Sequence, residues 1–246
     1  YGQLGDGTTT HRSTPTQTAS LGINRTAVVT FHEHSGQSSQ TACLAGTYQP
    51  NTGQTSCLDT DAGYYTNNLA FTSQIECPVG EWQSNTGSTG CYLANVGHYV
   101  NSTASTNQTE CTAGTYQPNQ GQSSCLDADA GFYVIPNIYP QDYQTACLAG
   151  TYQPDTGQTS CDDTDVGYYV NSTASTTQTE CAAGTYQPDT GQISCDDADA
   201  GYYVPGIAYA YQTACVAGTF QPDTGQTSCD DAEAGHYVFS VNQTYQ

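Results

Sequence analysis

The sequence predicts a chain of small tandem repeats stapled by disulfides and argues against one large globular domain. Closely similar stretches begin at six cysteines along the 246 residues. Only 36% of the residues are apolar and there is no Met, so little material is available for a large core. Twelve cysteines in short Gly- and Thr-rich units indicate an oxidising compartment, where disulfides replace such a core. We therefore expect an extracellular protein, either secreted or at the cell surface.

The cysteine spacing predicts which cysteines pair. The spacing between the two cysteines of a repeat is the same in all six repeats, whereas the step to the next repeat is longer and increases after Cys125. Pairing across repeats would leave Cys43 and Cys229 without partners, whereas pairing within repeats uses all twelve. The predicted disulfides are Cys43-Cys57, Cys77-Cys91, Cys111-Cys125, Cys147-Cys161, Cys181-Cys195 and Cys215-Cys229.

A turn is expected midway between the cysteines of each pair. Gln-Pro-x-x-Gly occurs there, as in residues 153–157. Proline presets φ and glycine accepts a positive φ, so this stretch can reverse the chain and bring the two sulfurs together. Each closed loop of about 15 residues should contribute roughly 3 kcal/mol in the chain-entropy model.

The pattern Cys-x-x-Gly-Thr-Tyr-x-x-x-x-Gly-x-x-x-Cys, as in residues 181–195, resembles the ephrin-receptor-like cysteine-rich repeat. That repeat is itself similar to the first module of tumour-necrosis-factor-receptor domains. The resemblance covers residues 43–240 and implies an elongated, all-β extracellular rod of small modules, with little or no helix and no catalytic residues. A second cysteine common in the family is replaced by Ala or Val before the glycine, so one disulfide remains in each repeat.

The remaining boundaries follow from this repeat. Residues 1–18 resemble part of a blade of regulator-of-chromosome-condensation propeller repeats, and residues 26–32 have the composition of a strand. A propeller needs at least about four blades, so we expect this piece to be the severed edge of a larger precursor. The expected organisation is residues 1–42 as propeller remnant, strand and linker, then repeats at 43–76, 77–110, 111–146, 147–180, 181–214 and 215–246.

Charge and hydropathy exclude two classes of partner. The net charge is −21, with no lysine and only Arg12 and Arg25 as cations. Phosphate binding needs clustered cations, so nucleic acid is not expected as a partner. No run of about 18 apolar residues is present to span a bilayer.

The acidic loop after each second cysteine has two interpretations. It is either a solvated acidic face or a weak calcium site, since its aspartates and a following glycine partly match calcium-binding loops. Calcium is the one cofactor left open. A transition metal on His32-Glu33-His34 is the alternative to an ordinary surface strand there. The calcium candidates are Asp162, Asp163, Asp165, Asp196, Asp197, Asp199, Asp230, Asp231 and Glu233.

No catalytic constellation emerges, and we do not expect an enzyme. Cysteines committed to disulfides cannot act as nucleophiles, and the five histidines do not share one repeat position. The tyrosine pair that follows each acidic loop, as in Tyr64-Tyr65, is expected to pack over the disulfide as a miniature core. A carbohydrate-binding aromatic strip is the alternative interpretation.

Glycosylation acceptors follow alternate repeats. Linkers after the second, fourth and sixth repeats contain Asn-x-Ser/Thr, whereas those after the odd repeats are apolar and contain none. This alternation predicts a half turn between neighbouring repeats, with one glycan-bearing side and one apolar side. Asn24 is a further acceptor outside the repeats. The acceptors within them are Asn101, Asn107, Asn171 and Asn242.

Two functions from different classes fit these features. The first is a glycosylated structural protein that assembles head to tail with copies of itself into a filament or surface layer. Residues 36–42 resemble the tail of a missing repeat, and the strand at 26–32 is expected to connect neighbouring copies. The second is the stalk or binding module of an adhesin or receptor that recognises a protein or glycan.

Overall fold

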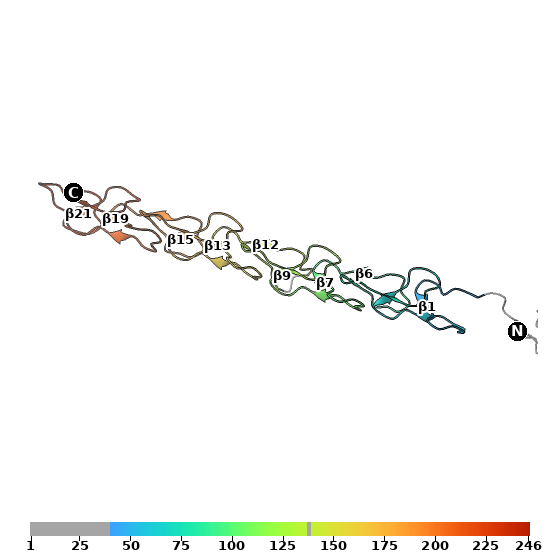
Figure 1. Ribbon diagram of the computed structural model, residues 1–246. Coiled ribbons are helices and arrows are strands. Elements are labelled where there is room, and N and C mark those ends of the chain that lie inside the picture. The colour runs from blue at the N-terminus through green and yellow to red at the C-terminus, as the bar shows by residue number, and fades with distance from the viewer. Residues whose placement is uncertain (1–39, 137–138) are drawn as a thin grey trace, which may run out of the picture. The chain divides into compact units, whose positions relative to one another are not determined.

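The computed structural model describes residues 40–136 and 139–246 and divides the chain into two units, Tyr1–Thr41 and Ala42–Gln246. The predicted propeller remnant, the strand at 26–32, Asn24 and the His32-Glu33-His34 motif lie outside the described residues. We call the second unit the hairpin array (Figure 1). Within the described ranges no helix is long and apolar enough to cross a membrane.

The described residues form only short antiparallel hairpins, each with two strands of two residues. This confirms the predicted class of small disulfide-rich all-β repeats. Two kinds of hairpin alternate along the array, and we name them by what joins their strands.

The disulfide hairpins enclose the Gln-Pro-x-x-Gly turn, with Ser84 in place of the proline in the second of them. They pair β1 (Thr47–Tyr48) with β2 (Leu58–Asp59), β5 (Glu81–Trp82) with β6 (Tyr92–Leu93), β9 (Thr115–Tyr116) with β10 (Leu126–Asp127), β13 (Thr151–Tyr152) with β14 (Asp162–Asp163), β17 (Thr185–Tyr186) with β18 (Asp196–Asp197), and β21 (Thr219–Phe220) with β22 (Asp230–Asp231).

The linker hairpins enclose the linkers between repeats. They pair β3 (Tyr64–Tyr65) with β4 (Ile75–Glu76), β7 (His98–Tyr99) with β8 (Thr109–Glu110), β11 (Phe132–Tyr133) with β12 (Thr145–Ala146), β15 (Tyr168–Tyr169) with β16 (Thr179–Glu180), and β19 (Tyr202–Tyr203) with β20 (Thr213–Ala214).

Both kinds of hairpin have the same register, so the structural period is half of the sequence repeat. Thr185 pairs with Asp197 in a disulfide hairpin, and Tyr202 pairs with Ala214 at the equivalent positions of the next linker hairpin. A glycine with positive φ marks the start of each hairpin, from Gly46 to Gly235. These glycines are evenly spaced along the chain, except for one longer interval from Gly131 to Gly150. Each of the first five sequence repeats therefore consists of two equivalent hairpins, and in the sixth Gly235 is followed by no strand pair.

Backbone hydrogen bonds join each hairpin to the next one. Between the first two hairpins, Gly46 N–H donates to Thr66 C=O (2.8 Å), Gln49 N–H to Phe71 C=O (3.0 Å) and Ala70 N–H to Cys43 C=O (2.9 Å). The same three bonds recur between later hairpins, for example from Gly150, Gln153 and Ala174. Because buried backbone groups need partners, this pattern fixes how successive hairpins sit on one another.

Each hairpin is also in direct contact with the next hairpin of its own kind. A side chain at Gly46 would clash with the backbone carbonyl of Gly87 in the next disulfide hairpin, and one at Gly63 with that of Ala104 in the next linker hairpin. Glycine is needed there for the close approach as well as for its positive φ. Hairpins of one kind therefore stack on each other, and Figure 1 shows hairpin tips along two opposite sides of the array.

This stacking corrects the predicted half turn between repeats. The linker that contains Ala208 and no acceptor contacts Gly167 of the preceding linker hairpin, whose own linker carries the acceptor Asn171. Acceptor-bearing and apolar linkers thus alternate within one row instead of facing opposite sides. The predicted half turn was wrong because it treated a whole sequence repeat as one structural step, whereas two hairpins occupy that length.

The core is narrow and is not made of tyrosine. The tyrosine pairs are half-buried in every hairpin where strands form, so the predicted aromatic core is wrong. Most of the buried side chains instead come from two positions of each hairpin, the residue three before its first glycine and the residue three after that glycine. These include Thr60, Cys77, Gln83, Ala94, Val100, Cys147, Val170, Ala198 and Val204.

Candidate functional site

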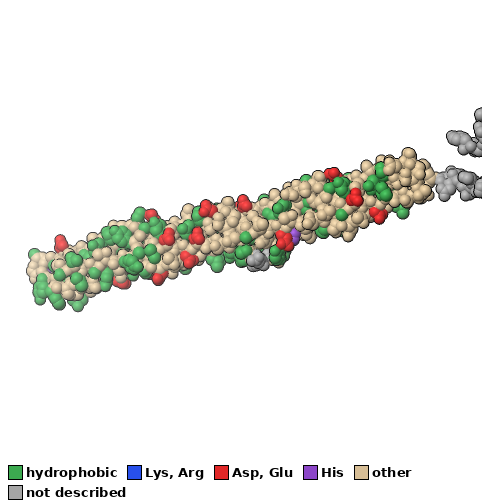
Figure 2. Space-filling view, turned by 90° about the horizontal axis from the view of Figure 1, so that it is seen from below, with side chains coloured by type: hydrophobic (Ala, Val, Ile, Leu, Met, Phe, Trp, Pro, Cys, Tyr) green, Lys and Arg blue, Asp and Glu red, His purple; other side chains and the backbone are tan. Residues whose placement is uncertain are grey.

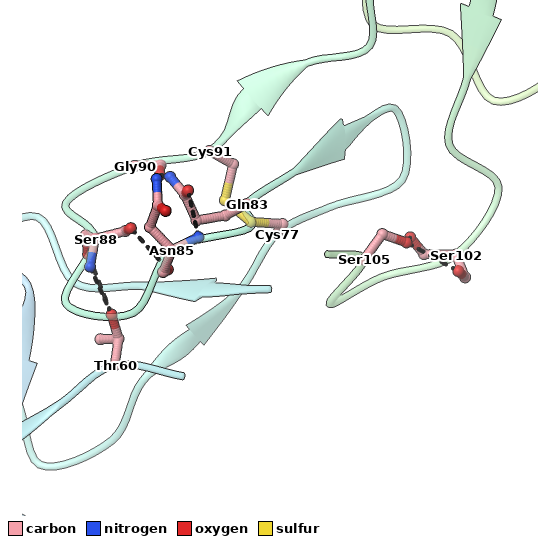
Figure 3. The surroundings of a disulfide bond; sticks show 9 residues. All are labelled: Thr60, Cys77, Gln83, Asn85, Ser88, Gly90, Cys91, Ser102 and Ser105. Carbon is pink, nitrogen blue, oxygen red and sulfur yellow. Dashed lines mark hydrogen bonds between the residues drawn. A yellow bond between two sulfur atoms is a disulfide. The ribbon is translucent and has the colours of Figure 1, made fainter. Parts of the chain in front are cut away.

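Each disulfide hairpin is closed by a disulfide and by a glutamine, which is buried in every one except the first, where Gln49 is half-buried. The six disulfides join the pairs that the spacing predicts, with Cα–Cα distances of 5.7 to 5.8 Å, and no cysteine of the described residues is free. In the hairpin of Figure 3, the Gln83 amide donates to Gly90 C=O (2.8 Å) and accepts from Asn85 N–H (3.1 Å). Equivalent glutamines make the same bonds in the other disulfide hairpins, as Gln187 does. The glutamine at the start of the turn, followed by proline in every disulfide hairpin except that of Gln83, therefore holds the turn closed from inside.

Four of the five linker hairpins carry a side-chain clip where the disulfide hairpins carry a disulfide. Gln178 Nε2 donates to Asp165 Oδ2 (2.7 Å), and Asp165 N–H donates to Gln178 Oε1 (2.8 Å). Gln178 occupies the position of the second cysteine. The sequence reasoning missed these clips, although a glutamine that recurs at a nearly constant distance after an aspartate was a visible signal. The same clip joins Gln74 to Asp61, Gln144 to Asp129 and Gln212 to Asp199.

The carboxylates of the three acidic loops that carry the calcium candidates point in different directions. Asp165 and Asp199 accept hydrogen bonds from glutamine, and Glu233 N–H donates to Gln246 (2.6 Å). Asp162 and Asp163 are consecutive on β14, so their side chains point to opposite faces. Asp196 and Asp197 on β18, and Asp230 and Asp231 on β22, are arranged in the same way. Among the described residues no group of three His, Cys, Asp or Glu side chains is placed to hold a metal ion.

The acceptor asparagines within the array all lie in linker hairpins or their last equivalent. Asn101, Asn107 and Asn171 are exposed. Asn242 is exposed as well, but its side-chain amide donates to the Tyr202 hydroxyl (2.9 Å) and its backbone lies against Gly201. The first three can therefore carry a glycan without breaking a side-chain contact.

The longest linker hairpin, β11–β12, creates one irregular surface. Tyr139 donates from its hydroxyl to Glu110 Oε2 (2.8 Å), and His98 Nε2 lies 3.9 Å from Glu110 Oε1. The hydrogen bond and the charge of Glu110 raise the pKa of Tyr139. Together with Asn107 and Gln141 these side chains line a shallow, open groove. The groove presents an aromatic ring beside a carboxylate and side-chain amides, so it offers both a stacking surface and hydrogen-bonding groups.

One cross-strand residue pair of the disulfide hairpins changes from apolar to acidic along the array. In the first three hairpins a half-buried aromatic ring lies opposite an exposed apolar residue, and in the last three an aromatic ring lies opposite aspartate. Burial, with Asp165 and Asp162 close by, raises the pKa of Tyr152. The apolar pairs are Tyr48–Leu58, Trp82–Tyr92 and Tyr116–Leu126, and the acidic pairs are Tyr152–Asp162, Tyr186–Asp196 and Phe220–Asp230.

The surface is acidic without compensating cations. Both arginines of the chain lie outside the described residues, so the described hairpins present carboxylates but no Lys or Arg. Figure 2 shows these carboxylates interspersed with hydrophobic side chains along one face of the array.

These features define a disulfide-rich tandem β-hairpin repeat protein. The chain matches no protein-family model and no curated protein. The ephrin-receptor-like and propeller resemblances therefore remain resemblances of motif, and function is inferred from the hairpin array itself.

Proposed function

We propose that this chain is an extracellular, glycosylated structural protein that assembles with copies of itself into a filament or surface layer. The observation that carries the proposal is the unbroken series of backbone hydrogen bonds from each hairpin to the next. Such a series uses the polar groups of the chain to build an extended body. The disulfide pairing of all twelve cysteines favours an oxidising compartment, and the exposed acceptor asparagines favour a secreted glycoprotein.

Sedimentation velocity of the purified full chain, with no ligand added, tests this proposal. We expect species larger than one chain whose share grows with protein concentration. A single monomeric boundary at every concentration, in both low and physiological salt, would contradict it. Glycopeptide analysis of the secreted protein should find glycans at Asn101, Asn107 and Asn171, and bare asparagines at all three would remove the support from glycosylation.

A second function, the stalk or binding module of an adhesin or receptor, is favoured by the groove beside Tyr139. There an exposed ring lies beside Glu110, Asn107 and Gln141, and this is the one hairpin of the described array that is longer than the others. Insertions into repeat proteins often form binding surfaces. Saturable binding of an oligosaccharide by a monomeric chain, lost in Tyr139→Ala, would favour this function over the first.

A further inference from the structure

The first three disulfide hairpins share an apolar strip. Residues directly opposite each other in an antiparallel pair project from the same face, so Trp82 and Tyr92 lie side by side with ring centroids 5.9 Å apart. Direct contacts of Gly46 with Gly87 and of Gly80 with Gly121 stack the three hairpins on one another. The apolar strip consists of Tyr48, Leu58, Trp82, Tyr92, Tyr116 and Leu126.

The strip is exposed enough to be an interface. Leu58 is 46% exposed, Tyr92 58% and Leu126 46%. Exposed apolar side chains that continue over several elements mark contact surfaces, whereas scattered ones do not. In the last three disulfide hairpins, Asp162, Asp196 and Asp230 occupy the same positions. The backbone therefore accepts aspartate there, and the first half does not need apolar residues for folding.

We infer that the apolar strip is the interface with a second copy of this chain, in an antiparallel arrangement. This inference rests on the proposed self-assembly and names one of its contacts, the one that joins two copies into a closed pair. A parallel, in-register pair would place three aspartates opposite three aspartates in the second half, which like-charge repulsion disfavours. In an antiparallel two-fold pair the strips cover each other and the acidic halves extend in opposite directions. A two-fold interface uses the same patch on both copies, as the repeated aromatic–aliphatic pairs of the strip permit.

The charge of the array predicts a salt dependence that distinguishes a second copy of this chain from a cationic partner. Two copies of this acidic chain repel each other, because the described residues include carboxylates but no Lys or Arg. Salt screens this repulsion and should therefore strengthen the association of the two copies. A basic peptide or polymer bound to the same chain would instead be released by salt. The direction of the salt effect therefore distinguishes the two partners.

The test compares two triple variants of the full chain that add the same charge. The strip variant is L58D/Y92D/L126D, and each of its aspartates copies a residue that the array already carries at the equivalent position. The control variant is L69D/I135D/I207D, which alters exposed residues of the linker hairpins. Disulfide mapping and circular dichroism show whether both variants fold.

We expect the strip variant to associate about tenfold or more weakly in sedimentation, because it places three charges where the proposed interface would bury three apolar side chains. The control variant should associate about as strongly as the wild type. Trp82 is the single tryptophan of the protein, so its fluorescence reports on the strip directly. Acrylamide quenching of Trp82 should fall as wild-type concentration rises and stay constant in the strip variant.

Equal weakening in both variants, or none in the strip variant, would overturn this interface while leaving self-assembly intact. Association that salt weakens would overturn the second copy in favour of a cationic partner. A wild-type chain that never associates would overturn the interface and the proposed function together.

Discussion

At the residue scale, the glycine that begins each hairpin is needed for space as well as for φ. Gly80 has φ 88°, and the backbone carbonyl of Gly121 occupies the space that a side chain at Gly80 would need. Gly53 has φ 74°, but the space around it is open. Gly80→Ala should therefore lower the free energy of unfolding by roughly 1–3 kcal/mol more than Gly53→Ala, which carries only the cost of the left-handed conformation. Chemical denaturation measures both. Equal losses would show that the close approach of alternate hairpins does not matter.

The opposite substitution, alanine to glycine, tests the backbone conformation of the linker hairpins. Ala104 has φ 52° at the position where disulfide hairpins have glycine. Ala104→Gly should raise the free energy of unfolding by about 1 kcal/mol, because relief of the left-handed strain exceeds the added freedom of the unfolded chain. Ala94, fully buried at the start of the same hairpin, is the matched control. There the substitution should destabilise, and a gain at both sites would count against the assigned backbone conformations.

At the element scale, the Gln–Asp clip is the counterpart of the disulfide. Gln178→Glu places a second carboxylate where the amide now donates to Asp165 at 2.7 Å. We expect a loss of about 1–2 kcal/mol at neutral pH, because a hydrogen bond becomes a like-charge contact. Thr177→Glu adds the same charge to the neighbouring exposed residue and should cost little. Equal thermal midpoints for the two variants would show that the clip does not support the hairpin.

The equivalence of the two hairpin types can be tested by covalent chemistry. Ala198 and Gln212 hold the positions of the two cysteines, in the same register as Cys181 and Cys195. The variant Ala198→Cys/Gln212→Cys should form a seventh disulfide spontaneously and gain roughly 3 kcal/mol for a loop of about 15 residues. Non-reducing peptide mapping detects the bond. Two free thiols in the folded variant would contradict the equivalence of the hairpins.

The sequence predicted the disulfide hairpins well and the linker hairpins poorly. The cysteines and the Gln-Pro-x-x-Gly turn are strong local signals, and they located the disulfides and the turns. The linker hairpins replace Cys with Thr, Ala or Gln, so their equivalence to the disulfide hairpins shows mainly in the glycine at the start and the aromatic residue two positions later. The core was misplaced because the tyrosines are the largest apolar side chains, whereas the tight spacing between hairpins admits only Cys, Val, Ala, Thr and Gln.

The candidate sites were predictable only in part. The acceptor motifs located exposed asparagines, since such motifs need only a local sequence. The hydrogen bonds of the acidic loops could not be predicted, because Gln178, the partner of Asp165, lies at the other end of the same hairpin in the sequence. The groove beside Tyr139 depends on a contact with Glu110, which belongs to the preceding linker hairpin, and no local pattern records it.

At the scale of the whole molecule, the hairpin array is stiffened by contacts of each hairpin to the next one and to the next but one. Arrays of this kind lose stability through their ends and interfaces, since each unit depends on its neighbours. In the self-assembly proposed above, copies of the array meet through their sides, and the apolar strip supplies a surface for one such contact.

Electron microscopy of the full glycosylated chain at physiological salt tests this central claim most directly. We expect elongated particles that lie side by side in pairs or larger bundles, with the overlap confined to one half of each particle. The strip variant L58D/Y92D/L126D should show the same particles unpaired. Single, separate particles of the wild-type chain at every concentration would contradict the account.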